Sequence, residues 1–435
     1  LTDVTGVQTC ALPISLPGGA HADYAHDALG HVVRVTDPGG RDWHLARTTM
    51  GRLAGTGDPL GRTNLVAHDA AGRLSVVTRA DGSTLAIHRD AAGQVTGRVW
   101  SAGLTLAYEY DEAGRLERHT DGLGQATEIS RDGEGRVTNA VIGGLNYGAA
   151  WTPGGRLAAV AYADGGIVVT YTYDPVTGLP ATVSDNLTGT TVSFEYDADR
   201  RLTAIHRPCE VDTTIEYDRE DRVVRVTDGG IVDIGYVHDD AGRLVSETRT
   251  VPKPAGAHLA AAADTNAYDA AAQLATPAAA YDALGRRTAD ARHAYTWSAD
   301  GRLAAVDGVA YGYDALGRVT ARNGRPLACH PAIGGAPLVD DGTNWYVWMP
   351  GGALLYMVAQ AEGAGGHAVL HCHFDRSGNA IALTDASGAV VESYAYEPGG
   401  LELAPAPSAV GNPFRFLGRQ GIRAEGAHGD LYHIR

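Results

Sequence analysis

Apolar and polar residues alternate along short stretches of this chain, and each stretch follows a glycine-containing turn signal. Residues 73–78 (RLSVVT) are one example. Alternation over this length is typical of a β-strand with one buried face. A second turn signal, such as residues 121–124 (DGLG), follows about one strand's length after the first. The pattern therefore predicts a unit of strand, turn, strand and turn, which is a β-hairpin.

The hairpin unit repeats at a fixed interval. Its turn has the frame of residues 110–116 (YDEAGRL), and the frame glycine recurs every 21 residues from Gly30 to Gly135. Later copies of the frame place the glycine at Gly155, Gly178, Gly242, Gly285, Gly301 and Gly317, and degenerate copies carry Arg200, Asp221 or Ala272 at that position. Self-similarity at a fixed period indicates a repeat architecture.

Two residues of the frame have a definite role in a turn. An Asp at the first corner can accept a hydrogen bond from a backbone N–H two residues later. A Gly three residues after it can adopt positive φ without a steric penalty. We therefore expect structural roles for the Asp and Gly pairs of the frame: Asp69 and Gly72, Asp111 and Gly114, Asp132 and Gly135, Asp282 and Gly285, and Asp314 and Gly317.

Composition excludes several classes of function. The formal net charge of −16 argues against nucleic acid as a partner, because binding its backbone needs clustered Lys and Arg. No apolar run approaches the roughly 20 residues of a membrane helix, so no membrane span is expected. The four cysteines, Cys10, Cys209, Cys329 and Cys372, are far apart and favour unpaired thiols. No P-loop, Gly-x-Ser-x-Gly elbow or paired-cysteine motif occurs, so no cofactor is expected.

The chain divides into three regions by sequence texture. Residues 1–15 lack the frame and resemble the translation of a sequencing adapter, so we interpret them as non-native and expect them to pack against nothing. Residues 16–320 carry the repeats, interrupted by a Pro- and Ala-rich linker or short helix within residues 250–280. Residues 321–435 have bulkier strand-like segments, such as residues 344–350 (NWYVWMP).

Particular residues of the last region form an ordered series. They are Asp375 and Gly378, Asp385 and Gly388, and the run Asn412, Pro413, Phe414, Arg415 and Phe416 followed by Gly418. This series resembles the Rhs repeat-associated core of bacterial Rhs proteins, and the Tyr-Asp frames resemble YD repeats. Related families include the C component of insecticidal toxin complexes and the animal teneurins.

The resemblance implies an all-β fold, in which a sheet of hairpin repeats spirals into a hollow shell around a C-terminal toxic segment. It also implies a secreted or cell-surface bacterial protein whose partners are that toxin segment and, by extension, proteins of a secretion apparatus. Family members cleave themselves at aspartates beyond the position of Arg435, so we expect a fragment incomplete at both ends, with no catalytic residues and no enzyme activity.

Four other interpretations of the sequence are less favoured. Residues 371–373 (HCH) with Asp375 suggest a metal site, but neighbouring strand residues point to opposite faces, which disfavours it. Catalysis by the repeated Asp and Arg is disfavoured because a catalytic site is built once. A propeller would need pairs of hairpins in blades of roughly 40 to 45 residues, and the repeats show no such alternation. A surface adhesin that binds carbohydrate through Tyr108, Tyr110, Tyr171 and Tyr173 is the alternative function.

Overall fold

A computed structural model describes residues 8–9, 14–15, 21–254, 267–276, 278–363, 366–397, 400, 402–403, 408, 410–425 and 431–433. These residues form strands and two short 3-10 turns, η1 (Ala163–Gly165) and η2 (Gly418–Gln420), and the described part of the chain contains no α-helix. The expected all-β hairpin fold is confirmed. The chain forms two compact units, one from Leu1–Gly124 with Ala262–Gly308 and the other from Gln125–Ala261 with Val309–Arg435.

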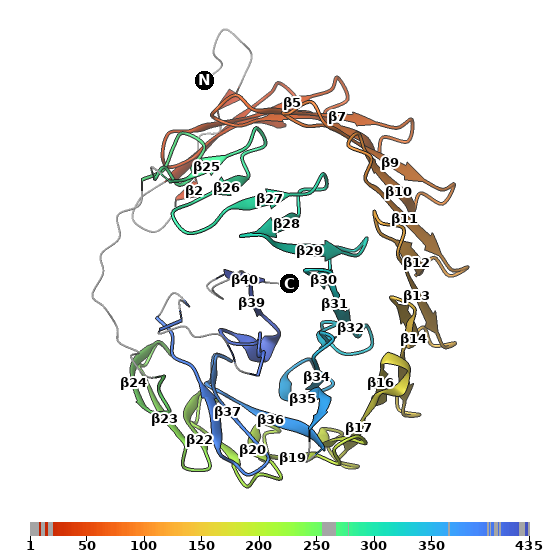
Figure 1. Cartoon of the computed structure of the whole chain (residues 1–435). Coiled ribbons are helices and arrows are strands. Elements are labelled where there is room, and N and C mark those ends of the chain that lie inside the picture. The colour runs from red at the N-terminus through yellow and green to blue at the C-terminus, as the bar shows by residue number, and fades with distance from the viewer. Residues whose placement is uncertain are drawn as a thin grey trace. The chain divides into compact units, whose positions relative to one another are not determined.

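Unit 1 is an antiparallel meander with two added hairpins. From β3 to β12 each strand pairs with the next, and the pairs β25–β26 and β27–β28 form the hairpins (Figure 1). Its strands are β1 (Gln8–Thr9), β2 (Ile14–Ser15), β3 (His21–His26), β4 (Val32–Thr36), β5 (Asp42–Arg47), β6 (Leu53–Gly57), β7 (Thr63–His68), β8 (Leu74–Thr78), β9 (Thr84–Arg89), β10 (Val95–Trp100), β11 (Thr105–Tyr110), β12 (Leu116–Thr120), β25 (Ala280–Tyr281), β26 (Arg287–Ala289), β27 (Tyr295–Trp297) and β28 (Leu303–Val306).

One expectation for the first residues is wrong. Within residues 1–15 the structure describes β1 and β2, and both pair with β3, through Gln8↔His26 and Ile14↔Ala22 among others. The outer edge of β3 carries backbone N–H and C=O groups that any extended segment can pair with, whatever its side chains. These four residues therefore do contact the repeats.

Unit 2 contains the longer meander and the bulkier strands. From β13 to β24 each strand pairs with the next, and the strands β32 to β38 form a second meander. Its strands are β13 (Ala126–Arg131), β14 (Val137–Ile142), β15 (Leu145–Trp151), β16 (Leu157–Tyr162), β17 (Ile167–Tyr173), β18 (Pro180–Asp185), β19 (Thr191–Tyr196), β20 (Leu202–His206), β21 (Thr213–Tyr217), β22 (Val223–Asp228), β23 (Val232–His238), β24 (Leu244–Thr250), β29 (Val309–Tyr313), β30 (Val319–Arg322), β31 (Arg325–Pro326), β32 (Ala328–Cys329), β33 (Leu338–Asp340), β34 (Asn344–Trp348), β35 (Leu354–Gly363), β36 (Gly366–Phe374), β37 (Ala380–Thr384), β38 (Val390–Ser393), β39 (Arg423–Glu425) and β40 (Leu431–His433).

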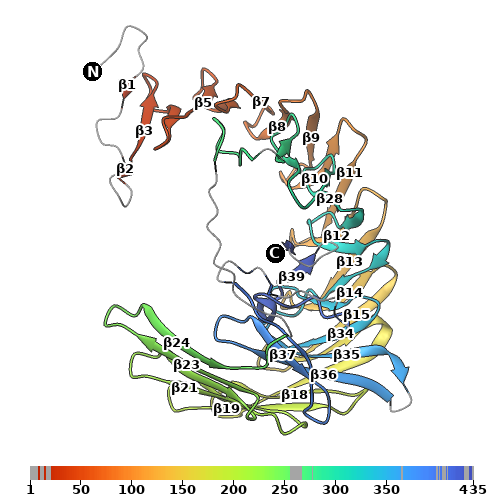
Figure 2. The same ribbon diagram turned by 60° about the vertical axis from the view of Figure 1, so that its left-hand side comes forward.

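The principal core of unit 2 lies between its two meanders. Figure 2 shows the blue strands β34 to β37 beside the yellow-green strands of the repeats. Tyr162 from the repeats and Tyr346, Trp348 and Tyr356 from the second meander are all fully buried. The Tyr162 hydroxyl donates to the Tyr346 carbonyl at 3.2 Å, and the Tyr356 hydroxyl donates to Asp185 Oδ2 at 2.8 Å. Hydrogen-bonded tyrosines therefore provide much of the bulk that the scarce phenylalanines do not.

The compact units do not follow the sequence texture. Repeats occur in both units, and the boundary predicted near residue 320 lies inside unit 2, so the three sequence regions stay a prediction. Most of the predicted linker, residues 255–266, lies outside the described residues. Cys209, Cys329 and Cys372 form no disulfide within the described part of the chain, and Cys10 lies outside it.

Candidate functional site

The aspartate of each frame closes its own turn. Oδ1 of Asp111 accepts from the backbone N–H of Ala113 at 3.0 Å and of Arg115 at 2.8 Å, and Oδ2 accepts from Arg115 Nε at 2.8 Å. The same Asp–Arg pair recurs at Asp69, Asp132, Asp282 and Asp314. The backbone N–H of Arg115, with its guanidinium, holds the pKa of Asp111 below its ordinary value. At neutral pH this carboxylate is ionised, and three hydrogen bonds hold it within its own turn.

The glycine of each frame occupies the left-handed region of the backbone. Gly72, Gly114, Gly135, Gly285 and Gly317 have φ between 76° and 92°, as expected. The degenerate copies keep this conformation at Arg200, Asp221 and Ala272, with φ of 69°, 63° and 62°. A residue with a side chain loses roughly 1–2 kcal/mol of stability at such a φ. The turn geometry is therefore kept even in frames where no glycine favours it.

The aromatic residue of the frame contacts the preceding repeat. Tyr110 OH donates to the carbonyl of Val95 at 2.9 Å, and Tyr217 OH donates to that of Leu202 at 2.9 Å. Trp151 uses its indole N–H in the same way. In each case the acceptor is the residue that follows the Arg or Gln of the previous frame. The aromatic side chain therefore reaches the turn of the previous repeat and donates a hydrogen bond to a backbone carbonyl beside that turn.

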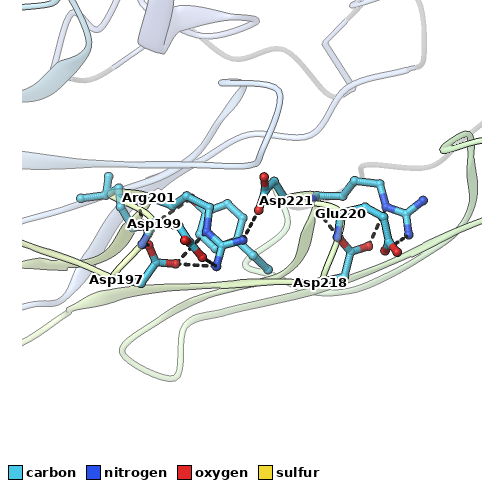
Figure 3. A network of polar contacts seen from close by, with 9 residues as sticks. Asp197, Asp199, Arg201, Asp218, Glu220 and Asp221 are labelled. Atoms are coloured by element: carbon cyan, nitrogen blue, oxygen red, sulfur yellow. Dashed lines mark hydrogen bonds and ion pairs between the residues drawn. The ribbon is translucent and has the colours of Figure 1, made fainter.

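The arginine of the frame contacts the following repeat. Arg201 lies between Asp197 of its own turn and Asp221 of the next turn (Figure 3), and its guanidinium is 4.8 Å from the ring centroid of Tyr217. The arginines of other frames lie over the next aromatic in the same way: Arg136 over Trp151, Arg156 over Tyr173 and Arg286 over Trp297. In these frames the aromatic residue, Asp and Arg link one turn to the next, and we call this set of contacts the turn ladder.

Part of this ladder was predictable from the sequence. The spacing of Asp and Gly predicts the turn within each frame, and the structure brings each such pair together. The contacts between frames were missed. The interval from the Arg to the next ring ranges from 11 residues (Arg286 to Trp297) to 17 residues (Arg156 to Tyr173), so no fixed spacing in the sequence indicates these contacts.

The later series of motif residues secures the second meander of unit 2. Phe414 packs edge-on against Tyr346 and Trp348, with centroid distances of 4.8 Å and 5.2 Å. Buried Arg415 donates from Nη1 to Glu402 Oε2 at 2.6 Å, and the Asn412 amide donates to the Tyr394 hydroxyl at 3.0 Å. The remaining members also make local contacts: the Pro413 carbonyl accepts from Ala424, Phe416 packs against Tyr396 and Tyr432, and Gly418 lies against Phe414.

The two remaining Asp–Gly pairs of the series repeat the turn chemistry. Asp375 Oδ1 accepts from the backbone N–H of Asn379 at 3.0 Å, and Gly378 has a φ of 90°. Asp385 and Gly388 form a turn of the same kind. Asp375 also accepts from Arg249 of β24 at 2.8 Å, which ties this turn to the repeats of unit 2.

Residues 371–373 lie in a buried polar cluster of unit 2. His373 Nε2 is 2.8 Å from Thr384 Oγ1, and its Nδ1 is 3.2 Å from Asp228 Oδ2. Burial and the nearby Arg207 lower the pKa of His373, whereas His373 and Arg207 hold the pKa of Asp228 below its ordinary value despite burial. Burial and Arg207 likewise lower the pKa of His371 to about 3. His371 is therefore neutral at physiological pH.

This cluster has the order of groups found in a nucleophile–base–acid triad, but no route to a substrate. Asp228, His373 and Thr384 each have 0% of their surface exposed. Among the residues that the structure describes, no three His, Cys, Asp or Glu side chains are placed to hold a metal ion. What the cluster does is connect β22 of the repeats to β36 and β37 across the core.

The tyrosines of the adhesin hypothesis are not exposed platforms. Tyr108 and Tyr171 are buried, and the hydroxyls of Tyr110 and Tyr173 donate to strand carbonyls. A separate open depression of about 540 Å³ in unit 1 is lined by Tyr268, Tyr281, Arg286, Arg287 and Trp297, among others. There Arg286 covers one face of the Trp297 ring and is itself bonded to Asp282 and Ser298.

No helix within the described residues has the length and apolar character needed to cross a membrane.

Two segments of the chain match a family model, and solved structures resemble the chain in fold. A family model described as RHS Repeat matches residues 26–63 and 89–126. The search among curated proteins gave no match. A structure of the Photorhabdus luminescens Tc holotoxin pore, carrying a TccC3 substitution, is similar with a TM-score of 0.52 and 14% identity, covering 95% of this chain and 29% of that chain. A crystal structure of TcdB2-TccC3 without its hypervariable C-terminal region gives 0.51 and 13% for the same coverage. At these identities the likeness shows the fold, and the chain spans about 29% of the length of the matched chains.

Proposed function

We propose, from the premise that this chain is an Rhs/YD-repeat protein, that it forms part of the wall of a shell that encloses a toxic polypeptide. In this proposal the chain is a structural component and its own residues perform no catalysis. The enclosed polypeptide is the C-terminal segment of the same protein, which the family resemblance expects beyond Arg435.

The observation that carries the proposal is the turn ladder. Its charged and aromatic side chains are the groups that could have supported chemistry, and they are bonded within their own turn or to the next one. Because each repeat contacts mainly its neighbours, such a sheet can be extended by adding repeats without building a new core. The size of a wall can be set by the number of repeats, whereas an enzyme needs one fixed arrangement of catalytic residues. Extension by repeats therefore favours a wall.

The structural matches support the same reading. One matched structure is that of a Tc holotoxin pore, and the other is that of TcdB2-TccC3 without its hypervariable C-terminal region. We infer that this protein has a corresponding variable segment, that it is secreted or displayed at the bacterial surface, and that proteins of a secretion apparatus are further partners. The buried Asp228–His373–Thr384 row supports a non-catalytic wall, since no substrate reaches it.

The proposal can be tested on the complete gene product with an epitope tag at its C-terminus. Limited proteolysis under native conditions should leave the tagged segment intact, because the wall shields it. The same protein unfolded in urea, and the tagged segment expressed alone, are the matched controls and should both be digested rapidly. Digestion of the tag at the same rate in native and unfolded protein would rule out enclosure. Tight binding of a glycan by residues 21–433, with no protection of the tag, would favour the adhesin instead.

A further inference from the structure

Strand β24 is an open edge of the repeat sheet in unit 2. It pairs with β23 on one side and with no other strand of the described residues (Figure 2). Each of its seven residues, Leu244 to Thr250, is exposed, and Val245 has 60% of its surface accessible. Within the meander of unit 2 the strands β14 to β23 each pair on both sides. An open edge of this length is a template for another strand.

The sequence of β24 is complementary to itself in one register. An antiparallel pair related by a two-fold axis places one residue opposite its own copy. With Thr248 at that position, Glu247 faces Arg249 of the second copy, Arg249 faces Glu247, and Ser246 faces Thr250. Opposite charges and paired hydroxyl residues directly across an antiparallel pair are favourable.

The neighbouring registers lack this complementarity. A two-fold axis at Glu247 would place two like-charged carboxylates directly opposite each other, which is destabilising. An axis at Ser246 would place Glu247 opposite the apolar Val245. The side chains of Glu247 and Arg249 already contact each other within one copy and remain 27% and 37% exposed, so both can also reach across an edge.

We propose that β24 is a self-association edge at which two copies of this chain pair antiparallel, about a two-fold axis at Thr248. The contact is isologous, so it closes after two copies and does not propagate into a fibre. Arg249 links the edge to the second meander through Asp375, so the strand is held in place before the partner arrives. This inference goes beyond the wall function proposed above and does not depend on it.

Cysteine cross-linking tests the register. In an antiparallel pair, directly opposed Cα atoms lie about 4.5–5.5 Å apart, which allows a disulfide. Under mild oxidation, Thr248→Cys should give a covalent dimer. Ser246→Cys is the matched control, because its two copies would lie about 13 Å apart along the strands. The parent chain, which contains the native cysteines Cys209, Cys329 and Cys372, gives the background.

Sedimentation equilibrium tests the charge pairing. Glu247→Arg should raise the dimer dissociation constant at least tenfold, because two arginines would then face each other at both ends of the pair. Glu216→Arg, an exposed strand residue of β21, is the control and should change it less than twofold. Three results would overturn the proposal. The parent chain could stay monomeric at all concentrations, or it could associate into open-ended polymers. Alternatively, Ser246→Cys could cross-link while Thr248→Cys does not.

Discussion

Acidification should destabilise unit 2 through its buried histidines. His330 is buried beside Tyr147 and Tyr162, its Nε2 lies 3.0 Å from the Gly148 carbonyl, and its Nδ1 accepts from the backbone N–H of Ala332. A second proton would therefore have to displace an N–H donor inside the core. Burial lowers the pKa of His330 to about 4, and burial with Arg207 lowers that of His371 to about 3.

The size of the effect follows from proton linkage. An unfolded histidine has a pKa near 6.5, so below that pH the unfolded chain binds protons that the folded chain excludes, and stability falls as the pH drops. Between pH 7 and pH 5 each of the two histidines should remove about 2 kcal/mol from the free energy of unfolding, or about 4 kcal/mol together. Asp111 and Asp132 do not contribute in this range, because hydrogen bonds from Arg115 and Arg136 hold the pKa values of their carboxyl groups below the ordinary value. Glu402 and Glu425, whose burial raises their pKa, act in the opposite sense.

Hydrogen exchange combined with urea unfolding can measure this, because peptides from β34 to β37 report on unit 2 separately from unit 1. His330→Gln, which keeps a donor for the Gly148 carbonyl, should reduce the pH-dependent loss by about 2 kcal/mol, and His371→Asn should do the same. Both variants retain Glu402 and Glu425, so the opposing contribution cancels in the comparison. Equal pH dependence in the parent and in both variants would refute the reasoning, and so would a loss confined to peptides of unit 1.

Three further predictions concern the repeats. Gly114→Val should destabilise its own and adjacent repeats by roughly 1–3 kcal/mol through backbone strain, and a calorimetric scan showing no loss would contradict this. Tyr217→Phe should cost about 1 kcal/mol in urea unfolding because the hydrogen bond to Leu202 is lost, whereas Tyr196→Phe, whose hydroxyl is buried without a partner, should cost nothing. Removal of Leu1–Ser15 should lower stability by less than about 1 kcal/mol, since few backbone pairings are lost, and a larger drop in melting temperature would show that the segment belongs to the fold.

The local structure of this protein was accessible from sequence because it is set by short-range chemistry. Asp111 and Gly114 lie in one turn, so their spacing alone predicts both the bend and the positive φ. The contact between Arg201 and Tyr217 is different, since it joins residues from successive frames, and no spacing within one frame predicts it. The frame was therefore predictable as a turn but not as a link between turns.

The environment of residues 371–373 was harder to predict. The alternation along a strand places His371 and His373 on one face and Cys372 on the other, and this alone suggests that one face is exposed. In the structure all three residues are at most 2% exposed, because β36 is an inner strand of its meander and is packed against the repeats. Which faces become covered depends on long-range packing between the two meanders, and a single strand carries no information about that.

The most direct test of the central claim, that these repeats form the wall of an enclosing shell, is an electron cryomicroscopy structure of the complete gene product. The account predicts a closed sheet of hairpin repeats around an internal volume that contains density for the C-terminal segment. A complete protein whose repeats surround no such volume, or whose C-terminal segment folds outside the sheet, would contradict it.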